Sequence, residues 1–166
     1  SGSGKTTLGR CLRKKLTKLG EDYILLDGDE LRKVFKLSEF NALNHSRETR
    51  LKLALQYAYL VKMLTDKNIN IIISTISMFK ELYEWNNENL VNYTLIYLKV
   101  NLETLIKRDP KKIYKRYFNG ELNNVSGLDL KIDEPSNADL ILNYDNLDTD
   151  SLALKVLEYL KLKKYE

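Results

Sequence analysis

The first seven residues, Ser1 to Thr7, read Ser-Gly-Ser-Gly-Lys-Thr-Thr and have the types and spacing to bind phosphate groups. Gly4, Lys5 and Thr6 fit the end of the pattern G-x-x-x-x-G-K-[ST], whose first glycine would fall two positions before Ser1. Glycines accept a positive φ, so the backbone N–H groups of such a loop can turn toward one anion. Lys5 would contact the β- and γ-phosphates, and the Thr6 hydroxyl would ligate Mg²⁺.

The helix expected behind this loop supports the same interpretation. Residues 6–19 carry leucines at a helical spacing, so the positive N-terminus of that helix would face the phosphates. A flexible Gly/Ser turn that caps a helix is the alternative. The residues expected to bind the nucleoside triphosphate are Ser1, Gly2, Ser3, Gly4, Lys5, Thr6 and Thr7.

Two carboxylates, Asp27 and Asp29, follow the apolar run 23–26, which is typical of a buried strand that delivers acids at its carboxyl end. Phosphoryl transfer requires the γ-phosphate of the donor to lie in line with the acceptor oxygen and its charge to be neutralised. The two acids could therefore orient Mg²⁺-bound water and accept or position the proton of the acceptor hydroxyl, with Asp27 also as a metal ligand. A surface Asp-Gly-Asp turn is the alternative.

Residues 109–135, here called the lid segment, are rich in Lys, Asn, Gly and Asp and have few apolar runs. Four cations lie between positions 108 and 115, and such a basic segment could close over the triphosphate and exclude water. Arg108 and Lys111 are the residues expected to contact the triphosphate. A charged, solvated connector is the alternative.

Alternating strand and helix signals must position these groups, and this alternation predicts an α/β fold with a parallel sheet. The strand that should enter the phosphate loop would lie before Ser1, so we expect the chain as given to be trimmed. The expected strands are 23–26, 70–75, 93–100 and 138–142, and the expected helices are 6–19, a short one from 30, 46–66, 80–90, 102–108 and 151–162.

Composition is that of one compact domain, residues 1–166. The 27 basic and 23 acidic residues are interspersed and leave a net charge of only +4, so the charge does not demand a nucleic-acid partner. Cys11 is the single cysteine and cannot form an internal disulfide, which favours a reducing compartment. No apolar run approaches the roughly 20 residues of a membrane span and no signal peptide is visible, so the expected location is the cytoplasm.

Several motifs, in the same order over nearly the whole chain, resemble the adenylylsulfate kinase (APS kinase) family. The resemblance implies a P-loop kinase fold, a three-layer α/β/α arrangement with a mostly parallel sheet and a basic lid. It also implies ATP with Mg²⁺ as donor, Asp29 as the base, phosphorylation of the ribose 3′-hydroxyl of adenosine 5′-phosphosulfate, and often a homodimer. The motifs are Ser1 to Thr7, Leu26-Asp27-Gly28-Asp29 with Arg32, Ile76-Ser77, Arg108-Asp109-Pro110-Lys111 with Tyr114-Lys115, Asn119-Gly120-Glu121 and Ser126-Gly127-Leu128-Asp129.

The resemblance also implies where the acceptor nucleotide binds. Its anionic phosphoanhydride needs arginines, which can bind it with two donors each. Arg32 and Arg47 match arginines of the family, and Arg50 lies one turn after Arg47; a solvated helix charge is the alternative for each. The acceptor-binding residues expected on this basis are Arg32, Phe35, Phe40, Arg47, Arg50, Ile76, Ser77, Lys115 and Val125.

The chain departs from the family pattern on the acceptor side. Glu48-Thr49 replaces the usual Glu-Asn, and Val125 replaces a phenylalanine that forms one wall of the adenine site. Because stacking on an aromatic side chain is worth about 1 to 3 kcal/mol per base, purine selection could weaken by one or two decades. A related kinase of capsule biosynthesis phosphorylates cytidine diphosphoramidate, and this chain resembles that branch. A cytidine nucleotide is therefore the alternative acceptor.

Two other classes of function remain open from the residues alone. A GTP-binding switch would use the same phosphate loop, but the Asn-Lys-x-Asp motif that reads guanine is absent from the sequence. A nucleic-acid kinase or binding module could use the basic lid, but the charges are mixed and lack interleaved aromatic residues. Small-molecule nucleotides are the expected partners, with no nucleic acid and no membrane.

Overall fold

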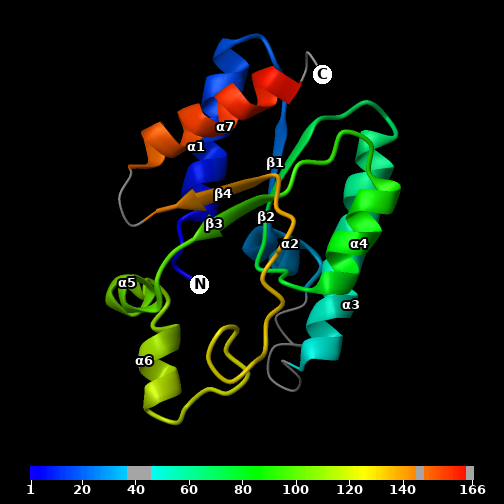
Figure 1. Ribbon diagram of the computed structural model, residues 1–166. Coiled ribbons are helices and arrows are strands. Elements are labelled where there is room, and N and C mark those ends of the chain that lie inside the picture. Colours follow the sequence, from blue (N-terminus) through cyan, green and yellow to red (C-terminus); the bar gives the residue numbers. More distant parts are fainter. Residues whose placement is uncertain (37–45, 145–147, 164–166) are drawn as a thin grey trace.

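The structure is a computed structural model that describes residues 1–36, 46–144 and 148–163. Helices and strands alternate along these ranges, as the sequence predicts (Figure 1). Their bounds are α1 (Lys5–Lys18), β1 (Ile24–Asp27), α2 (Gly28–Val34), α3 (Arg47–Thr65), β2 (Ile71–Ser74), α4 (Lys80–Asn89), β3 (Ile96–Lys99), α5 (Leu102–Arg108), α6 (Ile113–Phe118), β4 (Leu140–Asn143) and α7 (Thr149–Lys163). No helix in the described ranges is long and apolar enough to cross a bilayer.

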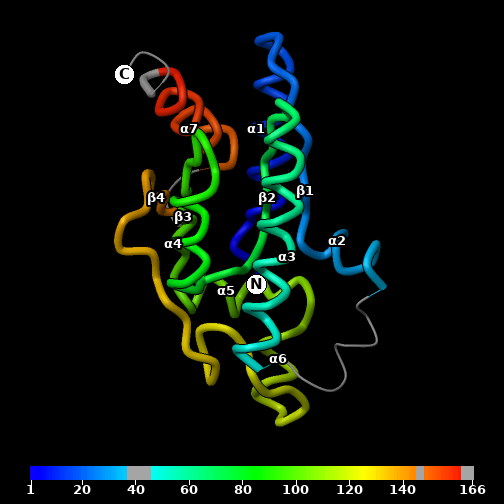
Figure 2. The backbone as a smooth tube through the Cα atoms, turned by 90° about the vertical axis from the view of Figure 1, so that its right-hand side faces the viewer, coloured from blue at the N-terminus to red at the C-terminus, as the bar shows by residue number. Residues whose placement is uncertain are grey.

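The strands pair in parallel, β1 with β2 and β3 with β4, and among the described residues they form two separate two-stranded sheets. Asp27 lies opposite Ser74 at the carboxyl end of one pair, and Lys99 lies opposite Asn143 at the carboxyl end of the other. The phosphate loop, α2 and α5 lie at this same end of the strands (Figure 1 and Figure 2). The parallel arrangement thus gathers the predicted site residues at one edge, the usual place for ligands in α/β sheets.

Two layers of helices cover the strands. On one side α1 and α7 pack together, and α1 contacts β1 and β2 while α7 contacts β4; on the other side α3 packs on α4 and contacts β2 (Figure 1). One buried cluster joins the leucines of α1 to β4 and α7, and a smaller one lies between α3 and α4. Their members are Leu8, Leu12, Leu16, Leu142, Leu152, Ala153, Val156 and Leu157 in the first, and Ala54, Ala58, Phe79 and Leu82 in the second.

Two local differences from the predicted elements have clear causes. Helix α2 begins at Gly28 instead of residue 30, because the Asp27 carboxylate caps it and accepts from the backbone N–H groups of Asp29 and Glu30 at 2.9 and 3.3 Å.

The lid segment contains a helix, α6, that the sequence pattern does not predict. The carboxylate of Asp109 accepts from the N–H groups of its first residues, and the Tyr114 side chain is buried, so a charged sequence still forms a packed element.

Helix α1 approaches the sheet closely at Gly9. A methyl group at this position would lie 2.8 Å from Ser74 Oγ and 2.9 Å from Leu25 Cδ1, both closer than normal contacts. Glycine therefore sets the separation between the helix that follows the phosphate loop and the strands that carry Asp27 and Ser74.

We predict that Gly9→Ala lowers the free energy of unfolding by up to about 2 kcal/mol, because overpacking costs about 1 to 3 kcal/mol and the helix propensity gain returns about 1 kcal/mol. Chemical denaturation measures the change, with Arg13→Ala on the exposed side of the same helix as a control that should shift it by less than about 0.5 kcal/mol. A Gly9→Ala protein that is more stable than the wild type would contradict this close packing.

Candidate active site

The phosphate loop has the backbone conformation that wraps an anion. Gly2 and Gly4 have φ values of 77° and 87°, and α1 begins directly after Gly4. The Lys5 ammonium donates to Ser3 Oγ at 2.9 Å across the loop. A helix N-terminus, two left-handed glycines and a lysine that folds back over the loop are the components of a phosphate site.

The Thr6 hydroxyl donates to Asp27 Oδ2 at 2.5 Å. Because the other oxygen of this carboxylate caps α2, Asp27 connects the phosphate loop to the helix that carries Asp29. The Asp27 side chain is buried, at 8% exposed, so these contacts are shielded from water. A hydroxyl and a carboxylate at this distance are hard oxygen donors of the kind that Mg²⁺ binds together with phosphate oxygens and water.

The Asp29 carboxylate lies between two cations. One oxygen pairs with Arg32 of the same helix, and the other pairs with Lys111 of the lid segment. The lid segment therefore reaches the carboxylate predicted to act as the base, and Lys111 lies where it could exchange this carboxylate for a phosphate.

Positive charges accumulate around the loop. Burial, followed by the charge of Lys111, lowers the pKa of Lys5 to about 8, against the opposing effect of Asp27. Burial and the charge of Arg32 also lower the pKa of Lys111. The cations are thus crowded and partly dehydrated, and an anionic ligand would relieve both effects.

A tyrosine that the sequence analysis did not select lies against the loop. A Cβ on Gly4 would lie 2.6 Å from Cε1 of Tyr144, the residue directly after β4. The Arg108 guanidinium in turn lies 4.5 Å from the centroid of the Tyr144 ring. Arg108 is therefore held beside the loop, and its expected contact with the triphosphate stays a prediction. The position of Tyr144 at the carboxyl end of a predicted strand is the signal that could have found it.

On the acceptor side, Arg50 connects α3 to the lid segment. Its guanidinium donates to the carbonyl oxygen of Asn124 at 2.8 Å and to Ser126 Oγ at 3.1 Å, on both sides of the buried Val125. Nearby, the half-exposed Phe35 ring stacks on Tyr57 of α3, with centroids 6.2 Å apart. Helix α3 thus contacts the lid segment through Arg50 and the residue after α2 through Tyr57, and the expected role of these residues in acceptor binding stays a prediction.

Arg47, one turn before Arg50 on α3, has different neighbours. Its guanidinium donates to both Glu81 carboxylate oxygens at 2.9 Å and to Asp133 Oδ2 at 2.7 Å, and it lies over the Phe79 ring. These contacts raise its pKa above the usual arginine value and attach the end of the lid segment to α4. Its expected role in acceptor binding stays a prediction.

The remaining expected residues are less constrained. Ile76 is exposed and, with Ser77, lies in the connection between β2 and α4, while the Lys115 side chain is exposed on α6. Phe40 lies outside the described residues. The expected roles of Ile76, Ser77 and Lys115 stay predictions.

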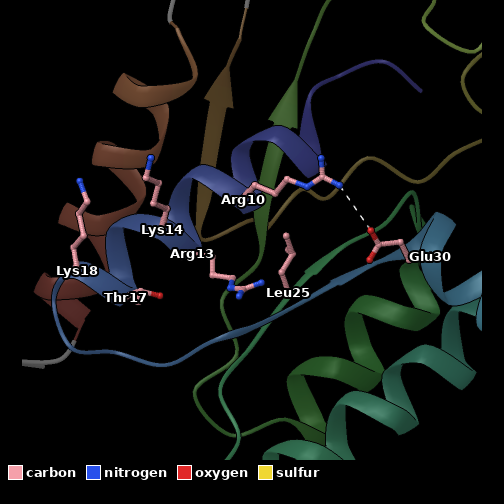
Figure 3. A pocket seen from close by; sticks show the side chains of 7 residues that line it. All are labelled: Arg10, Arg13, Lys14, Thr17, Lys18, Leu25 and Glu30. Carbon is pink, nitrogen blue, oxygen red and sulfur yellow. Dashed lines mark ion pairs between the residues drawn. The ribbon is translucent and has the colours of Figure 1, made fainter.

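A separate open groove of about 550 Å³ lies along the outer side of α1 (Figure 3). Basic side chains of α1 line it, and Arg10 pairs with Glu30 of α2 at 3.7 Å across it. None of the predicted site residues lines this groove. Because both partners of the ion pair are well exposed, the pair adds little to stability.

The comparisons with known proteins show the family of the chain. The profile of the adenylylsulphate kinase family matches residues 1–143. The chain belongs to the adenylylsulfate kinase family. It is therefore a phosphotransferase of the APS kinase type that acts on nucleotides. This assignment replaces the GTP-binding switch that the residues alone left open.

Individual relatives divide between two acceptors. The chain is 41% identical over 143 residues to the cytidine diphosphoramidate kinase of Campylobacter jejuni, covering 86% of this chain and 81% of that protein. It is 33% identical over 161 residues to the probable adenylyl-sulfate kinase of Pyrococcus abyssi, covering 97% and 90%. The APS kinase CysC of Mycobacterium tuberculosis, solved in complex with AMPPNP and APS, matches with a TM-score of 0.84 at 25% identity, covering 97% and 92%. The P-loop kinase fold is thus confirmed.

We predict that kcat/KM for the nucleoside triphosphate falls as the pH rises through about 8. Burial depresses the pKa of Lys5 to about 8 in the free enzyme, so Lys5 is charged below this pH and neutral above it. A neutral amine binds phosphate less well, and kcat/KM reports groups of the free enzyme. Lys5→Arg should remove the alkaline decline, although its rates are lower. A profile of the wild-type enzyme that stays flat well above pH 8 would contradict this assignment.

Proposed function

We propose that the protein is an ATP-dependent kinase that transfers the γ-phosphate to the ribose 3′-hydroxyl of a nucleoside 5′-phosphoanhydride. The observation that carries the proposal is the Asp27 carboxylate, which bonds to Thr6 of the phosphate loop and caps the helix that bears Asp29. Donor and acceptor groups are thereby held at a fixed separation, which is the main requirement of phosphoryl transfer.

On the donor side, the loop N–H groups and Lys5 would bind the β- and γ-phosphates. Thr6 and Asp27 would hold Mg²⁺, which supplies positive charge against the phosphate oxygens. Lys111 and Arg108, from the lid segment and α5, would neutralise further charge and exclude water. The electrostatic crowding at Lys5 and Lys111 supports this arrangement, because it would be relieved by a polyanion.

On the acceptor side, Asp29 would accept a hydrogen bond from the ribose hydroxyl and orient its oxygen toward the γ-phosphate. In the structure Arg32 and Lys111 both pair with this carboxylate. A bound triphosphate would compete for Lys111, so donor binding would free one oxygen of Asp29 for the hydroxyl. Direct in-line transfer follows and needs no phosphorylated Ser77.

Two acceptors are candidates, adenosine 5′-phosphosulfate and cytidine diphosphoramidate. The first is the acceptor of the family and would belong to sulfate assimilation; the second would belong to capsule biosynthesis. The higher identity to the cytidine diphosphoramidate kinase, 41% against 33%, favours the cytidine acceptor. The aliphatic Val125 in place of an aromatic wall favours it as well. The homodimer implied by the family stays a prediction.

We predict that the enzyme with MgATP phosphorylates cytidine diphosphoramidate with at least a roughly tenfold higher kcat/KM than adenosine 5′-phosphosulfate, because one aromatic wall is worth about that factor. Coupled ADP release measures the rates, and NMR of the product identifies the phosphorylated hydroxyl. A strong preference for the sulfate would reject the cytidine acceptor and leave the kinase assignment intact. Turnover of neither acceptor would reject the proposed function.

We also predict that Asp29→Asn lowers kcat by about 10² to 10⁴, since an amide cannot accept the hydroxyl proton. The KM for ATP should change little, because Thr6 and Asp27 remain. Asp22→Asn, an exposed acid just before β1, is the matched control and should retain wild-type kcat. Full activity of Asp29→Asn would show that this carboxylate does not serve the acceptor.

A further inference from the structure

Tyr144 has a fixed position at the carboxyl end of the strands. It directly follows β4, and its backbone N–H donates to the carbonyl oxygen of Lys99 at 3.1 Å, so it continues the pairing with β3. Its side chain packs against the buried cluster between α1, β4 and α7. The Tyr144 hydroxyl lies 2.6 Å from Thr149 Oγ1, at the start of α7. The residue is therefore held by a strand at its backbone and by a helix at the tip of its ring.

This ring contacts both the phosphate loop and Arg108. A Cβ on Gly4 would lie 2.6 Å from Cε1 of the ring and 3.4 Å from Cδ1 and Cζ, so the ring lies directly against the glycine that precedes Lys5. Arg108 is the last residue of α5, and its guanidinium carbon lies over the ring at 4.5 Å from the centroid. One side chain thus determines how far Arg108 lies from the phosphate loop.

The contact with Tyr144 leaves the hydrogen-bond donors of Arg108 available. No hydrogen bond or ion pair joins the Arg108 guanidinium to another residue in the described ranges. An aromatic face attracts a guanidinium through its ring electrons and takes up none of its N–H groups. A carboxylate would hold the guanidinium as well, but it would occupy two donors and neutralise the charge. The ring therefore orients Arg108 and keeps it competent to bind a phosphate.

We infer that Tyr144 is a positioning residue of the donor site, which holds the Arg108 guanidinium beside the phosphate loop so that the triphosphate meets it already in place. This inference rests on the proposed function, since it concerns the donor of the same reaction. An arginine side chain has many rotamers, and ordering it during binding lowers affinity. Tyr144 has only two side-chain torsions and is anchored to β3 and α7, so it orders Arg108 before the nucleotide binds.

The test measures the binding of Mg²⁺ with AMPPNP, an ATP analogue that is not hydrolysed, by isothermal titration calorimetry, and it needs no acceptor. Tyr144→Leu removes the aromatic face and keeps an apolar side chain. We expect its Kd to rise about threefold to thirtyfold, as for loss of one cation–π contact. In an Arg108→Ala background the same substitution should change Kd by less than about twofold, because the group that Tyr144 positions is gone. Tyr144→Phe keeps the ring face and should bind within about threefold of wild type.

Tyr159→Leu is the matched control, because it makes the same substitution at the opposite end of β4. Tyr159 is in α7, and its hydroxyl donates at 3.2 Å to Asp139 Oδ1, in the residue before β4 begins. The Kd of this variant should equal that of the wild type.

Each outcome separates positioning of Arg108 from a merely structural role. An unchanged Kd for Tyr144→Leu would overturn the inference, and so would an equal loss with and without Arg108, which would make Tyr144 a support of Gly4 alone. Equal weakening in Tyr144→Phe and Tyr144→Leu would also overturn it, because the hydroxyl and not the ring face would then matter.

Two further results keep the test decisive. If the thermal midpoint shows that Tyr144→Leu is unfolded, Tyr144→Met provides the same test with a more adaptable apolar side chain. A wild-type protein that does not bind AMPPNP with Mg²⁺ would reject the proposed function, whereas wild-type binding that is insensitive to position 144 would reject only this inference.

Discussion

The Asp27 carboxylate is the group on which the rest of the site depends. One oxygen accepts from the Thr6 hydroxyl at the start of α1, and the other accepts from two N–H groups at the start of α2. A single buried acid thus joins the phosphate loop to the helix that carries Asp29 and Arg32. Parallel pairing of β1 with β2 holds this acid at the carboxyl end of the strands, where α1 is close enough for Thr6 to reach it.

Electrostatics explains why this arrangement suits a polyanionic substrate. Charges of Arg32 and Lys111 act on their neighbours Arg50, Lys111 and Lys5, and the carboxylates of Asp27 and Asp29 lie among these cations. Burial and mutual repulsion lower the pKa values of both lysines and of Arg50. Such crowding costs free energy, and phosphate groups bound beside these cations would remove the cost. The same charges would therefore favour a polyanionic ligand.

Arg47 and Arg50 show how one turn of a helix gives two arginines different neighbours. Arg47 points toward α4 and bonds to Glu81 and Asp133, which attaches the end of the lid segment. Arg50 bonds to the loop around Val125. Both were expected at the acceptor because both are arginines near the start of the same predicted helix. Their different neighbours follow from the direction of each side chain around the helix axis.

Local patterns in the sequence were sufficient for the phosphate loop, the alternation of helices and strands, and the resemblance to a kinase family. Gly4-Lys5-Thr6 is such a pattern. The positive φ of its glycine and the start of the helix after it are both set by residues adjacent in the chain, so the sequence alone reveals them. Helix α6 was not predicted from the sequence. It is stabilised by the Asp109 carboxylate at its start and by the burial of Tyr114, and neither contact can be recognised in a segment rich in charged residues. Only the tertiary structure decided that Tyr144 lies against Gly4 and which neighbours Arg47 and Arg50 contact. Those contacts join residues far apart in the chain, such as Arg50 with Ser126, and depend on how the helices pack around the strands.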